Sequence, residues 1–300
     1  MVLRSSVFKQ LSRNAFKYQL QHCLFSSKEI EVTDKANGVF HLQLNRPEHR
    51  NSFTLDLWKD LKIIFDDLSE NSKCRSIVLS GSGKSFCTGI DIKNGLTGLL
   101  EIVKNEEMDT ARKARAMRKM IKICQDSFAS AEKCNKPVIA AIHSHCYGAG
   151  ISLASCCDVR YCSNDTIFSI KEVDIGIAAD VGILQRMELI AANASWAREV
   201  TFTARDFSAT EALNNGFVSR VLDNHQDCVN AALSLAEQIA KKSPIAVQGS
   251  KLAMNYARNH GVDSSVEWIL TWNQSQLQSE DLIRSATAKM SKTEPIFEDV

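Results

Sequence analysis

Apolar residues in the first third of the chain are spaced so as to predict a strand, a helix and a second strand. Apolar and polar residues alternate from Phe40 to Asn45, which is the period of a half-buried strand. From Thr54 the spacing becomes three and four, as in an amphipathic helix capped by Thr54 or Ser52, with apolar positions Leu57, Leu61, Ile64, Phe65 and Leu68. Residues 76–80 then form a short apolar strand that ends at Gly81. This order predicts a parallel or mixed sheet with helical crossovers.

The same alternation of elements continues to about residue 225. The pattern predicts a helix within 101–133, strands at 138–142, 159–162 and 167–170, and a helix at 151–157. After Asp206 it predicts the helices 208–214, 228–242 and 245–260. We therefore expect a mixed α/β core over residues 29–225 and a helical C-terminal segment over 226–300.

Composition is typical of a folded globular protein, with 44% hydrophobic and 24% charged residues. The 36 basic and 35 acidic residues leave a formal charge of +1, so the whole chain has no field that favours nucleic acid or an anionic membrane. No apolar run approaches the roughly 20 residues of a membrane-spanning helix.

Residues 1–28 differ from the rest because they contain five basic residues and no acidic one. Serines and large apolar residues are interspersed, as in a mitochondrial transit peptide, and a disordered basic tail is the alternative. Residues 29–300 alone carry 31 basic and 35 acidic residues, a formal charge of −4. The last four residues, Phe297-Glu298-Asp299-Val300, do not form the peroxisomal signal Ser-Lys-Leu.

Ten cysteines are scattered through apolar stretches, and none forms a C-x-x-C pair. This distribution favours reduced, buried thiols over a disulfide framework. His143, His145 and Cys146 lie close in sequence, but their spacing matches no common zinc site and no second ligand pair follows. We therefore expect no metal site.

A basic run lies in the predicted helix, at Arg112, Lys113, Arg115, Arg118, Lys119 and Lys122. Such a run is typical of a solvated helix face. The alternative is a positive rim that attracts a phosphorylated ligand.

Three segments contain the candidate chemistry. Residues 85–92 and 145–150 are glycine-containing loops that follow strands, and the second one enters a helix and presents backbone N–H groups there. Residues 171–182 place acidic side chains among small apolar residues. Each segment alone is a weak signal, and neither loop matches a dinucleotide or P-loop fingerprint.

Several landmarks in this order resemble the enoyl-CoA hydratase/isomerase (crotonase) superfamily, from about Glu29 to the C-terminal helices. They are Asn45-Arg46-Pro47 with Asn51, Phe86-x-x-Gly89-x-Asp91, residues 136–142, Gly148-Ala149-Gly150, Cys157-Asp158-Val159-Arg160 and Gly182-x-x-Gln185-Arg186. Within the superfamily, residues 171–174 and 178–182 resemble the Δ3,5-Δ2,4-dienoyl-CoA isomerases.

The resemblance implies a spiral core of ββα units, homotrimers that often pair into homohexamers, and an acyl-CoA thioester as substrate. Coenzyme A is then part of the substrate, and no separate cofactor is implied. The backbone N–H groups of Ile90 and Ala149 would form an oxyanion hole, and Thr88, Gly89, Ile90, Asp91 and Ile92 would line the ligand site. Ala149 stands where Gly is common in this superfamily, but a backbone donor survives that change.

The resemblance also assigns Glu172 as the base near C2 of the substrate and Asp180 as the acid near C6. Ala178, Ala179 and Val181 would supply apolar surroundings that raise the carboxyl pKa values. The alternatives are a solvent-facing acid for Glu172 and a helix N-cap for Asp180.

The remaining acids of these segments are expected to have structural roles. We expect Asp174 to be a turn or cap residue, and Asp91 and Asp158 to be structural anchors.

Ser152 departs from the family pattern, because hydratases carry a glutamate there and typical dienoyl-CoA isomerases an aspartate. Serine cannot act as a carboxylate base, so hydration is disfavoured. The expected function is 3,5- to 2,4-dienoyl-CoA isomerisation in fatty acid β-oxidation. The alternatives are a Δ3-Δ2 enoyl-CoA isomerase and a catalytically weakened acyl-CoA-binding protein.

Overall fold

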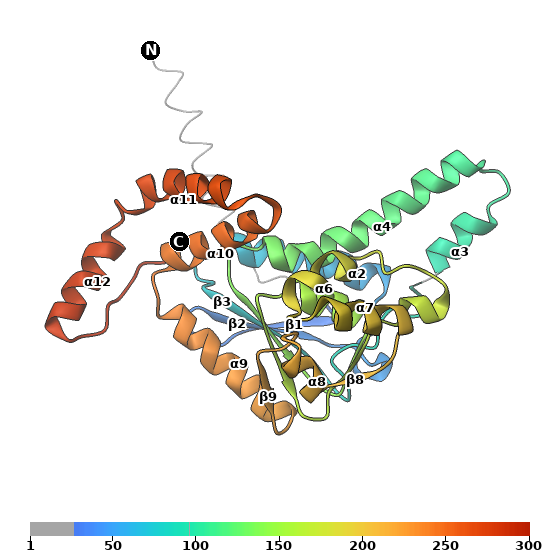
Figure 1. Ribbon diagram of the computed structural model, residues 1–300, viewed down its shortest axis with the longest axis horizontal. Helices are drawn as coiled ribbons and strands as arrows, with labels where there is room; N and C mark the ends of the chain where they lie inside the picture. Colours follow the sequence, from blue (N-terminus) through green and yellow to red (C-terminus); the bar gives the residue numbers. More distant parts are fainter. Residues whose placement is uncertain (1–26, 96) are drawn as a thin grey trace, which may run out of the picture.

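The computed structural model describes residues 27–95 and 97–300, and its frame is a six-stranded sheet with the order β1-β2-β3-β4-β6-β9 (Figure 1). The strands are β1 (Ile30–Asp34), β2 (Val39–Leu44), β3 (Ser76–Gly81), β4 (Val138–Ile142), β6 (Val159–Ser163) and β9 (Arg220–Leu222). Neighbouring strands are parallel except β1 and β2, which are antiparallel. The predicted mixed sheet with helical crossovers is confirmed.

A second, smaller sheet supports the candidate site. It contains β5 (His145–Tyr147), β7 (Ile167–Ser169) and β8 (Phe207–Ser208), with β5 parallel and β8 antiparallel to β7. A parallel bridge between Cys87 and Cys146 joins β5 to the loop that follows β3. The chain passes from β5 into α5 (Ala149–Ser155) and from β7 into the 3₁₀ helix η2 (Lys171–Ile175).

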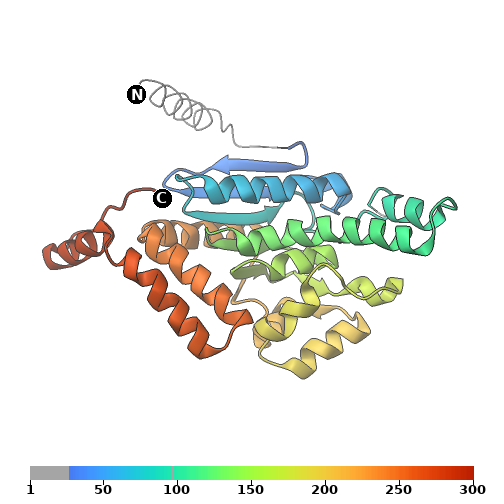
Figure 2. The same cartoon turned by 90° about the horizontal axis from the view of Figure 1, so that it is seen from above.

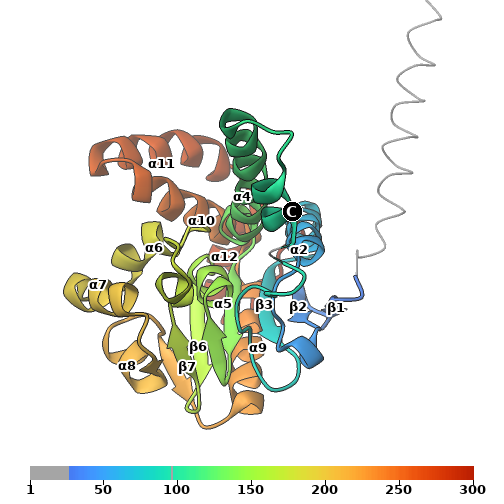
Figure 3. The same ribbon diagram turned by 90° about the vertical axis from the view of Figure 1, so that its right-hand side faces the viewer.

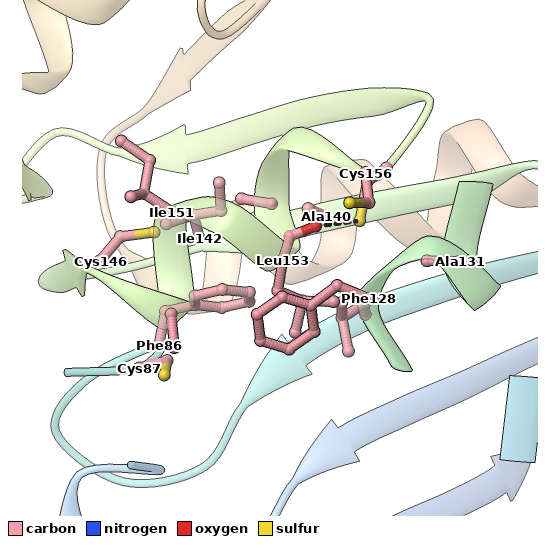
Figure 4. Close-up of a cluster of buried hydrophobic side chains, with 14 of the residues drawn as sticks. Phe86, Cys87, Phe128, Ala131, Ala140, Ile142, Cys146, Ile151, Leu153 and Cys156 are labelled. Carbon is pink, nitrogen blue, oxygen red and sulfur yellow. Dashed lines mark hydrogen bonds between the residues drawn. The ribbon is translucent and has the colours of Figure 1, made fainter. Parts of the chain in front are cut away.

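Helices cover both faces of the large sheet, because successive side chains of a strand point to opposite faces. In β4, Val138, Ala140 and Ile142 belong to the core cluster that includes residues of α2 (Leu55–Glu70), α4 (Thr110–Lys133) and α5, part of which is shown in Figure 4. Ile139 and Ala141 instead pack with α9 (His225–Ala240) on the other face. The sheet therefore lies between two helical layers.

This two-sided cover corrects the expectation of a half-buried strand at β2. Five of its six residues are buried and one, Gln43, is half-buried. His41 occupies a polar position of the alternating pattern, yet it is 9% exposed, and its Nε2 lies 2.8 Å from Ser80 Oγ. The alternation was misleading because one buried imidazole has a hydrogen-bonding partner in the core.

The predicted helices are present with small changes of boundary. Thr54 Oγ1 accepts a hydrogen bond from Leu57 N and caps α2, and the segment 101–133 forms two helices, α3 (Thr97–Lys104) and α4. The other helical elements are η1 (Pro47–His49), α6 (Ile183–Ile190), α7 (Ala194–Thr203), α8 (Ala209–Asn214), α10 (Pro244–Asn259), α11 (Val262–Gln276) and α12 (Glu280–Ser291). Figure 3 shows α6, α7 and α8 beside β6 and β7.

Two helical extensions leave the body on opposite sides (Figures 1 and 2). One is α3 with the beginning of α4, and the other contains α11 and α12. The helical segment expected from residue 226 begins inside α9, but α9 packs on the sheet and Lys251 of α10 is hydrogen-bonded to the body, so the extension away from the body starts with α11. No helix among the described residues is long and apolar enough to cross a bilayer.

The nine cysteines in the described part of the chain are free and buried, as expected. Burial raises the pKa of the Cys87 thiol to about 12, so it stays protonated near neutral pH. Cys23 and almost all of the segment 1–28 lie outside the described residues.

Candidate active site

Two loops that are distant in sequence meet at the candidate active site. Cys87 N donates to His145 O at 3.1 Å, and Tyr147 N donates to Cys87 O at 3.0 Å. A Cβ built on Gly89 would lie 3.5 Å from Tyr147 O and 3.9 Å from Ala149 N. The loop after β3 and the start of α5 are therefore in direct contact.

The backbone N–H groups of Ile90 and Ala149 have no acceptor within the described residues. Ile90 is held on both sides, since Phe53 N donates to Gly89 O at 2.8 Å and Asp91 N donates to Phe53 O at 2.9 Å. Ala149 is the first residue of α5, where an N–H group has no partner within the helix. Two rigid donors are thus free to bind a carbonyl oxygen.

Glycines on both sides of Ala149 permit this close approach. Gly148 has a φ of 49°, and a Cβ there would lie 3.6 Å from Glu172 Oε1 and 3.7 Å from Gly89 Cα. A Cβ on Gly150 would lie 2.7 Å from Cys87 O, which is a clash with backbone. The small-residue turn therefore keeps the two free N–H groups and the Glu172 carboxyl close together.

Glu172 lies on η2, directly after β7, and is half-buried. Its Oε2 atom is buried without a hydrogen-bond partner in the described part of the chain. Burial raises the pKa of this carboxyl group, and the nearby charge of Asp180 raises it further. A raised pKa makes the carboxylate a stronger base.

Asp180 lies in the irregular segment between η2 and α6. Burial raises the pKa of its carboxyl group, although the residue as a whole is exposed. Asp180 is not the N-cap of α6, because Gly182 occupies that position. The cap alternative for Asp180 is therefore excluded by the structure.

Glu172, Asp180, Ile90 and Ala149 line one cavity of about 170 Å³. Its other lining residues are Trp58, Thr88, Gly89, Ile92, Gly148, Lys171, Ile175, Ile177 and Val181. The wall is largely apolar, and its polar members are the two carboxyl groups, the two free backbone donors and the residues Thr88 and Lys171. Such a cavity can hold a thin apolar chain with a carbonyl group at the two donors.

Comparison with known proteins assigns the chain to an established family. Residues 34–299 match the family described as Enoyl-CoA hydratase/isomerase. The chain belongs to this family. The fold and family expected from the sequence landmarks are thereby confirmed.

Within the family, the chain is similar to several curated isomerases. The mitochondrial Δ(3,5)-Δ(2,4)-dienoyl-CoA isomerase of Rattus norvegicus is 47% identical over 265 residues, covering 88% of this chain and 80% of the rat protein. The protein of the same name from Homo sapiens is 41% identical over 269 residues, covering 90% and 81%. A peroxisomal protein with this activity name from Arabidopsis thaliana is 40% identical over 274 residues, covering 91% and 98%.

Solved structures of the family share the fold. The crystal structure of an enoyl-CoA hydratase from Bacillus anthracis superposes with a TM-score of 0.81 at 27% identity, covering 90% of this chain and 99% of that chain. This chain therefore shares its fold with a hydratase of the family.

Asp91 is the residue of the expected ligand loop that does not line the cavity. Its carboxylate lies 3.2 Å from the Arg46 guanidinium and accepts hydrogen bonds from Lys93 N and from the backbone and side chain of Asn94. Burial acts to raise the pKa of this carboxyl group, but the bonds from Asn94 and Arg46 outweigh it and lower the pKa. Asp91 is a structural anchor of the loop.

The other acids of interest also bind neighbouring residues. Asp158 accepts from Val138 N at 2.8 Å and from Lys251 Nζ at 2.7 Å. Asp174 is an exposed residue of η2 whose carboxylate lies 3.7 Å from Lys171 Nζ. Asp158 has the structural role expected for it, whereas Asp174 lies inside η2 and does not cap it, since Ile170 is the N-cap.

Ser152 lies on α5 one turn after Gly148, is fully buried, and does not line the cavity. Its Oγ has no hydrogen-bond partner in the described part of the chain. The site therefore has two carboxyl groups and no third acid at this position.

Several lining residues were not expected from the sequence. Trp58 occupies α2 beside the buried stripe and resembles a core position, and Ile175 and Ile177 lie among the acids without a pattern of their own. Of the small apolar residues expected around Asp180, Ala179 is buried and Val181 lines the cavity, but Ala178 is exposed. The apolar environment comes mainly from isoleucines.

The remaining sequence candidates lie elsewhere. Of the basic run on α4, all but the half-buried Lys113 are exposed to solvent. His143 stacks on His225 with ring centroids 3.6 Å apart, whereas His145 Nδ1 lies 2.9 Å from Ser144 Oγ. The two histidines near Cys146 therefore pack against different neighbours.

Proposed function

We propose that the protein is an isomerase that converts 3,5-dienoyl-CoA into 2,4-dienoyl-CoA in fatty acid β-oxidation. The proposal is based on one apolar cavity, which is lined by Glu172, Asp180 and the free N–H groups of Ile90 and Ala149. The names of the rat and human relatives, at 47% and 41% identity, support the same reaction.

The proposed reaction moves one proton out and one proton in. Glu172 removes a proton from C2, and the electron pair spreads over C2 to C6 and the thioester oxygen. The N–H groups of Ile90 and Ala149 stabilise the negative charge on that oxygen, an effect for which one donor is typically worth about 10²–10³ in rate. Asp180 then gives a proton to C6, and the double bonds at C3 and C5 become double bonds at C2 and C4.

The pKa directions of the two carboxyl groups support these roles. A proton donor must hold its proton near neutral pH, and burial raises the pKa of Asp180 in that direction. A base benefits from a raised pKa as long as it is ionised, and burial raises the pKa of Glu172. After one turnover Glu172 holds the extra proton and Asp180 lacks one, so both groups exchange protons before the next cycle.

The distribution of acids disfavours hydration. Hydration in this family uses two glutamates around one water, whereas position 152 is a fully buried serine. Proton transfer at both ends of a diene needs only the two carboxyl groups that line the cavity. A Δ3-Δ2 enoyl-CoA isomerase would need one base, and the second carboxyl group at Asp180 favours the diene reaction.

The mitochondrial matrix is the proposed location, with residues 1–28 as transit peptide. The basic, acid-free composition of that segment and the mitochondrial names of the rat and human relatives support it, whereas the Arabidopsis relative is named peroxisomal. A homotrimer or homohexamer is the proposed assembly, since α11 has no buried residue and many apolar side chains of α11 and α12 are exposed.

Incubating the purified protein with 3-enoyl-, 2-enoyl- and 3,5-dienoyl-CoA tests the function. Of the three substrates, we expect only the 3,5-dienoyl-CoA to give the ultraviolet absorbance of a conjugated 2,4-diene. Turnover confined to the 3-enoyl-CoA would replace the proposal with the one-base isomerase. Binding of all three thioesters without any product would instead indicate an acyl-CoA-binding protein.

A further inference from the structure

The segment that carries Asp180 has few connections to the rest of the molecule. It runs between Gly176 and Gly182, whose φ angles of 79° and 117° are in the left-handed region that favours glycine. At its start Ile177 N donates to Glu172 O at 3.1 Å, and at its end Arg186 Nη1 donates to Gly182 O at 3.0 Å. The chain between these two bonds has no regular secondary structure.

One hydrogen bond ties the backbone of residues 178–181 to another element within the described structure. The side-chain amide of Gln125, on α4, donates from Nε2 to the main-chain carbonyl of Asp180 at 2.7 Å. Because the bond ends on the backbone, it fixes the position of Asp180 and leaves its carboxyl group free.

Gln125 is held on a rigid part of α4. The adjacent Cys124 is buried, and Phe128, one turn further on, is fully buried. The ring of Phe128 packs edge-on against Phe53 with centroids 5.0 Å apart. Phe53 in turn exchanges hydrogen bonds with the oxyanion loop through Gly89 and Asp91. Gln125, which donates to the Asp180 carbonyl, and the loop that contains Gly89 and Asp91 are therefore both anchored to the same core.

Gln125 reaches Asp180 from outside the 170 Å³ cavity. Asp180 and Val181 line both the 170 Å³ cavity and a second cavity of about 470 Å³, and Gln125 lines the second one only. Gln125 therefore does not touch a ligand bound between Glu172 and the oxyanion donors.

We infer that Gln125 is a positioning residue that sets where Asp180 meets the distal end of the diene. The inference rests on the isomerase function proposed above. Proton transfer at C6 needs the Asp180 carboxyl within hydrogen-bond reach of that carbon, and a misplacement of about 1 Å can cost about 10²-fold in rate. Proton removal at C2 depends on Glu172 and the oxyanion donors, which Gln125 does not hold.

Substitution of Gln125 by methionine in the full-length protein tests this inference, because methionine keeps the length and removes the donor. Two rates are measured with 3,5-octadienoyl-CoA in D₂O: formation of the 2,4-diene by absorbance, and deuterium entry at C2 of the remaining substrate. We expect Gln125→Met to lower diene formation about 10- to 100-fold and to change C2 exchange by no more than about threefold.

The control is Gln185→Met, since Gln185 lines the same second cavity but makes no hydrogen bond to Asp180. This variant should keep the wild-type ratio of the two rates. A second measurement combines Gln125→Met with Asp180→Asn. If Gln125 acts through Asp180, the double variant forms diene no more slowly than Asp180→Asn alone.

The possible outcomes separate this inference from the proposed function. Absence of diene formation by the unchanged protein would overturn both. With an active wild type, three results overturn the role of Gln125 alone: wild-type diene formation in Gln125→Met, an equal loss of C2 exchange, or a loss that adds to that of Asp180→Asn.

Discussion

Glu172 and Asp180 share one cavity, but the proposed reaction needs them in opposite protonation states at the start of turnover. The two groups interact, since the charge of Asp180 raises the pKa of Glu172. They therefore titrate as a pair with macroscopic pKa values. The more exposed Asp180 can exchange its proton with solvent, whereas Glu172 Oε2 is buried.

Replacing Glu172 by glutamine removes the base and keeps the shape of the side chain. We expect diene formation to fall by about 10²–10⁴. The thermal unfolding midpoint should change little, because Oε2 has no hydrogen-bond partner to lose in the described structure. Wild-type turnover in this variant, measured by diene absorbance, would remove Glu172 from the mechanism.

The same residue makes the wild-type rate depend on pH. Protonated Glu172 cannot accept the C2 proton, so kcat/KM should fall as pH decreases through its pKa, which burial raises above the ordinary value for glutamate. The acid limb of the pH profile is therefore expected at a higher pH than for a solvated glutamate. Direct proton exchange at C2 should follow the same limb.

At the residue scale, sequence reasoning could identify side chains that belong to a family pattern. Glu172, Asp180 and Ala149 stand at recognisable positions, and the structure brings them to one cavity. Gln125 could not be found in this way, because its role depends on a bond to a carbonyl 55 residues away. Trp58 was missed because a residue that lines a site from a helix has the same spacing as a core residue.

At the scale of elements, the site depends on the contact between α5 and the loop after β3. A Cβ on Gly150 would lie 2.7 Å from Cys87 O and 2.9 Å from Cys87 Cβ, so the two elements must separate to accept it. Gly150→Ala should therefore lower the free energy of unfolding by about 1–3 kcal/mol. It should also lower diene formation about 10²-fold or more, because the oxyanion donors move apart.

Gly261→Ala is the matched control for this substitution. Nothing lies within 4 Å of a Cβ at Gly261, and its φ of −65° suits alanine. Urea unfolding and diene absorbance should both stay close to the wild type. A Gly150→Ala protein with wild-type activity would show that the two elements need not touch.

A second contact between elements makes stability depend on pH. His143, just after β4, stacks on His225 at the start of α9, and each ring has one buried nitrogen without a partner in the described structure. Burial, and then the proximity of His225, lowers the pKa of His143 to about 4. Burial also lowers the pKa of His225, although Asp165 acts in the opposite direction.

Between pH 6.5, the ordinary pKa of histidine, and about pH 4, the folded state therefore binds fewer protons than the unfolded state. The free energy of unfolding should decrease as the pH falls from about 6.5 towards 4. In His225→Gln, urea unfolding followed by circular dichroism should show a shallower decrease. The exposed His49 is the control, and His49→Gln should keep the wild-type slope.

Elements were predictable where one face of a segment is apolar and a cap residue marks its start. Thr54, Ser208 and Ser243 are the N-caps of α2, α8 and α10, and each hydroxyl group accepts a hydrogen bond from a backbone N–H of the first turn. The helices α6 and α7 and the short strands β5, β8 and β9 were not predicted, because their segments show no clear apolar periodicity, whereas β7 was predicted at 167–170. β2 was predicted to be half-buried, but α9 buries its second face. The residues of α9 lie almost 200 positions later in the chain, so local spacing cannot show this contact.

At the scale of the whole molecule, the body and the C-terminal extension differ in how they bury apolar side chains. The body has a continuous core, whereas α12 buries only Ala288 and α11 buries no residue. The exposed apolar side chains of this extension are Val262, Val266, Leu270, Leu277, Leu282, Ile283 and Met290. A soluble monomer rarely exposes so large an apolar surface, so these helices fit the proposed contact between copies of the chain.

Light scattering on the purified protein should therefore give a mass of three or six chains. Changing Leu270 to glutamate places a charge on α11, where a copy of the chain would cover it, and burial of an unpaired charge is costly. We expect Leu270→Glu to shift the mass towards that of one chain, with a lower thermal midpoint.

Ile63→Glu is the control, because Ile63 is 47% exposed on α2, away from the extension, and Leu270 is 52% exposed. The two substitutions change the charge and apolar surface of a monomer alike. If both leave a trimer or hexamer intact, α11 is not the contact. A wild-type mass of one chain would contradict the proposed assembly.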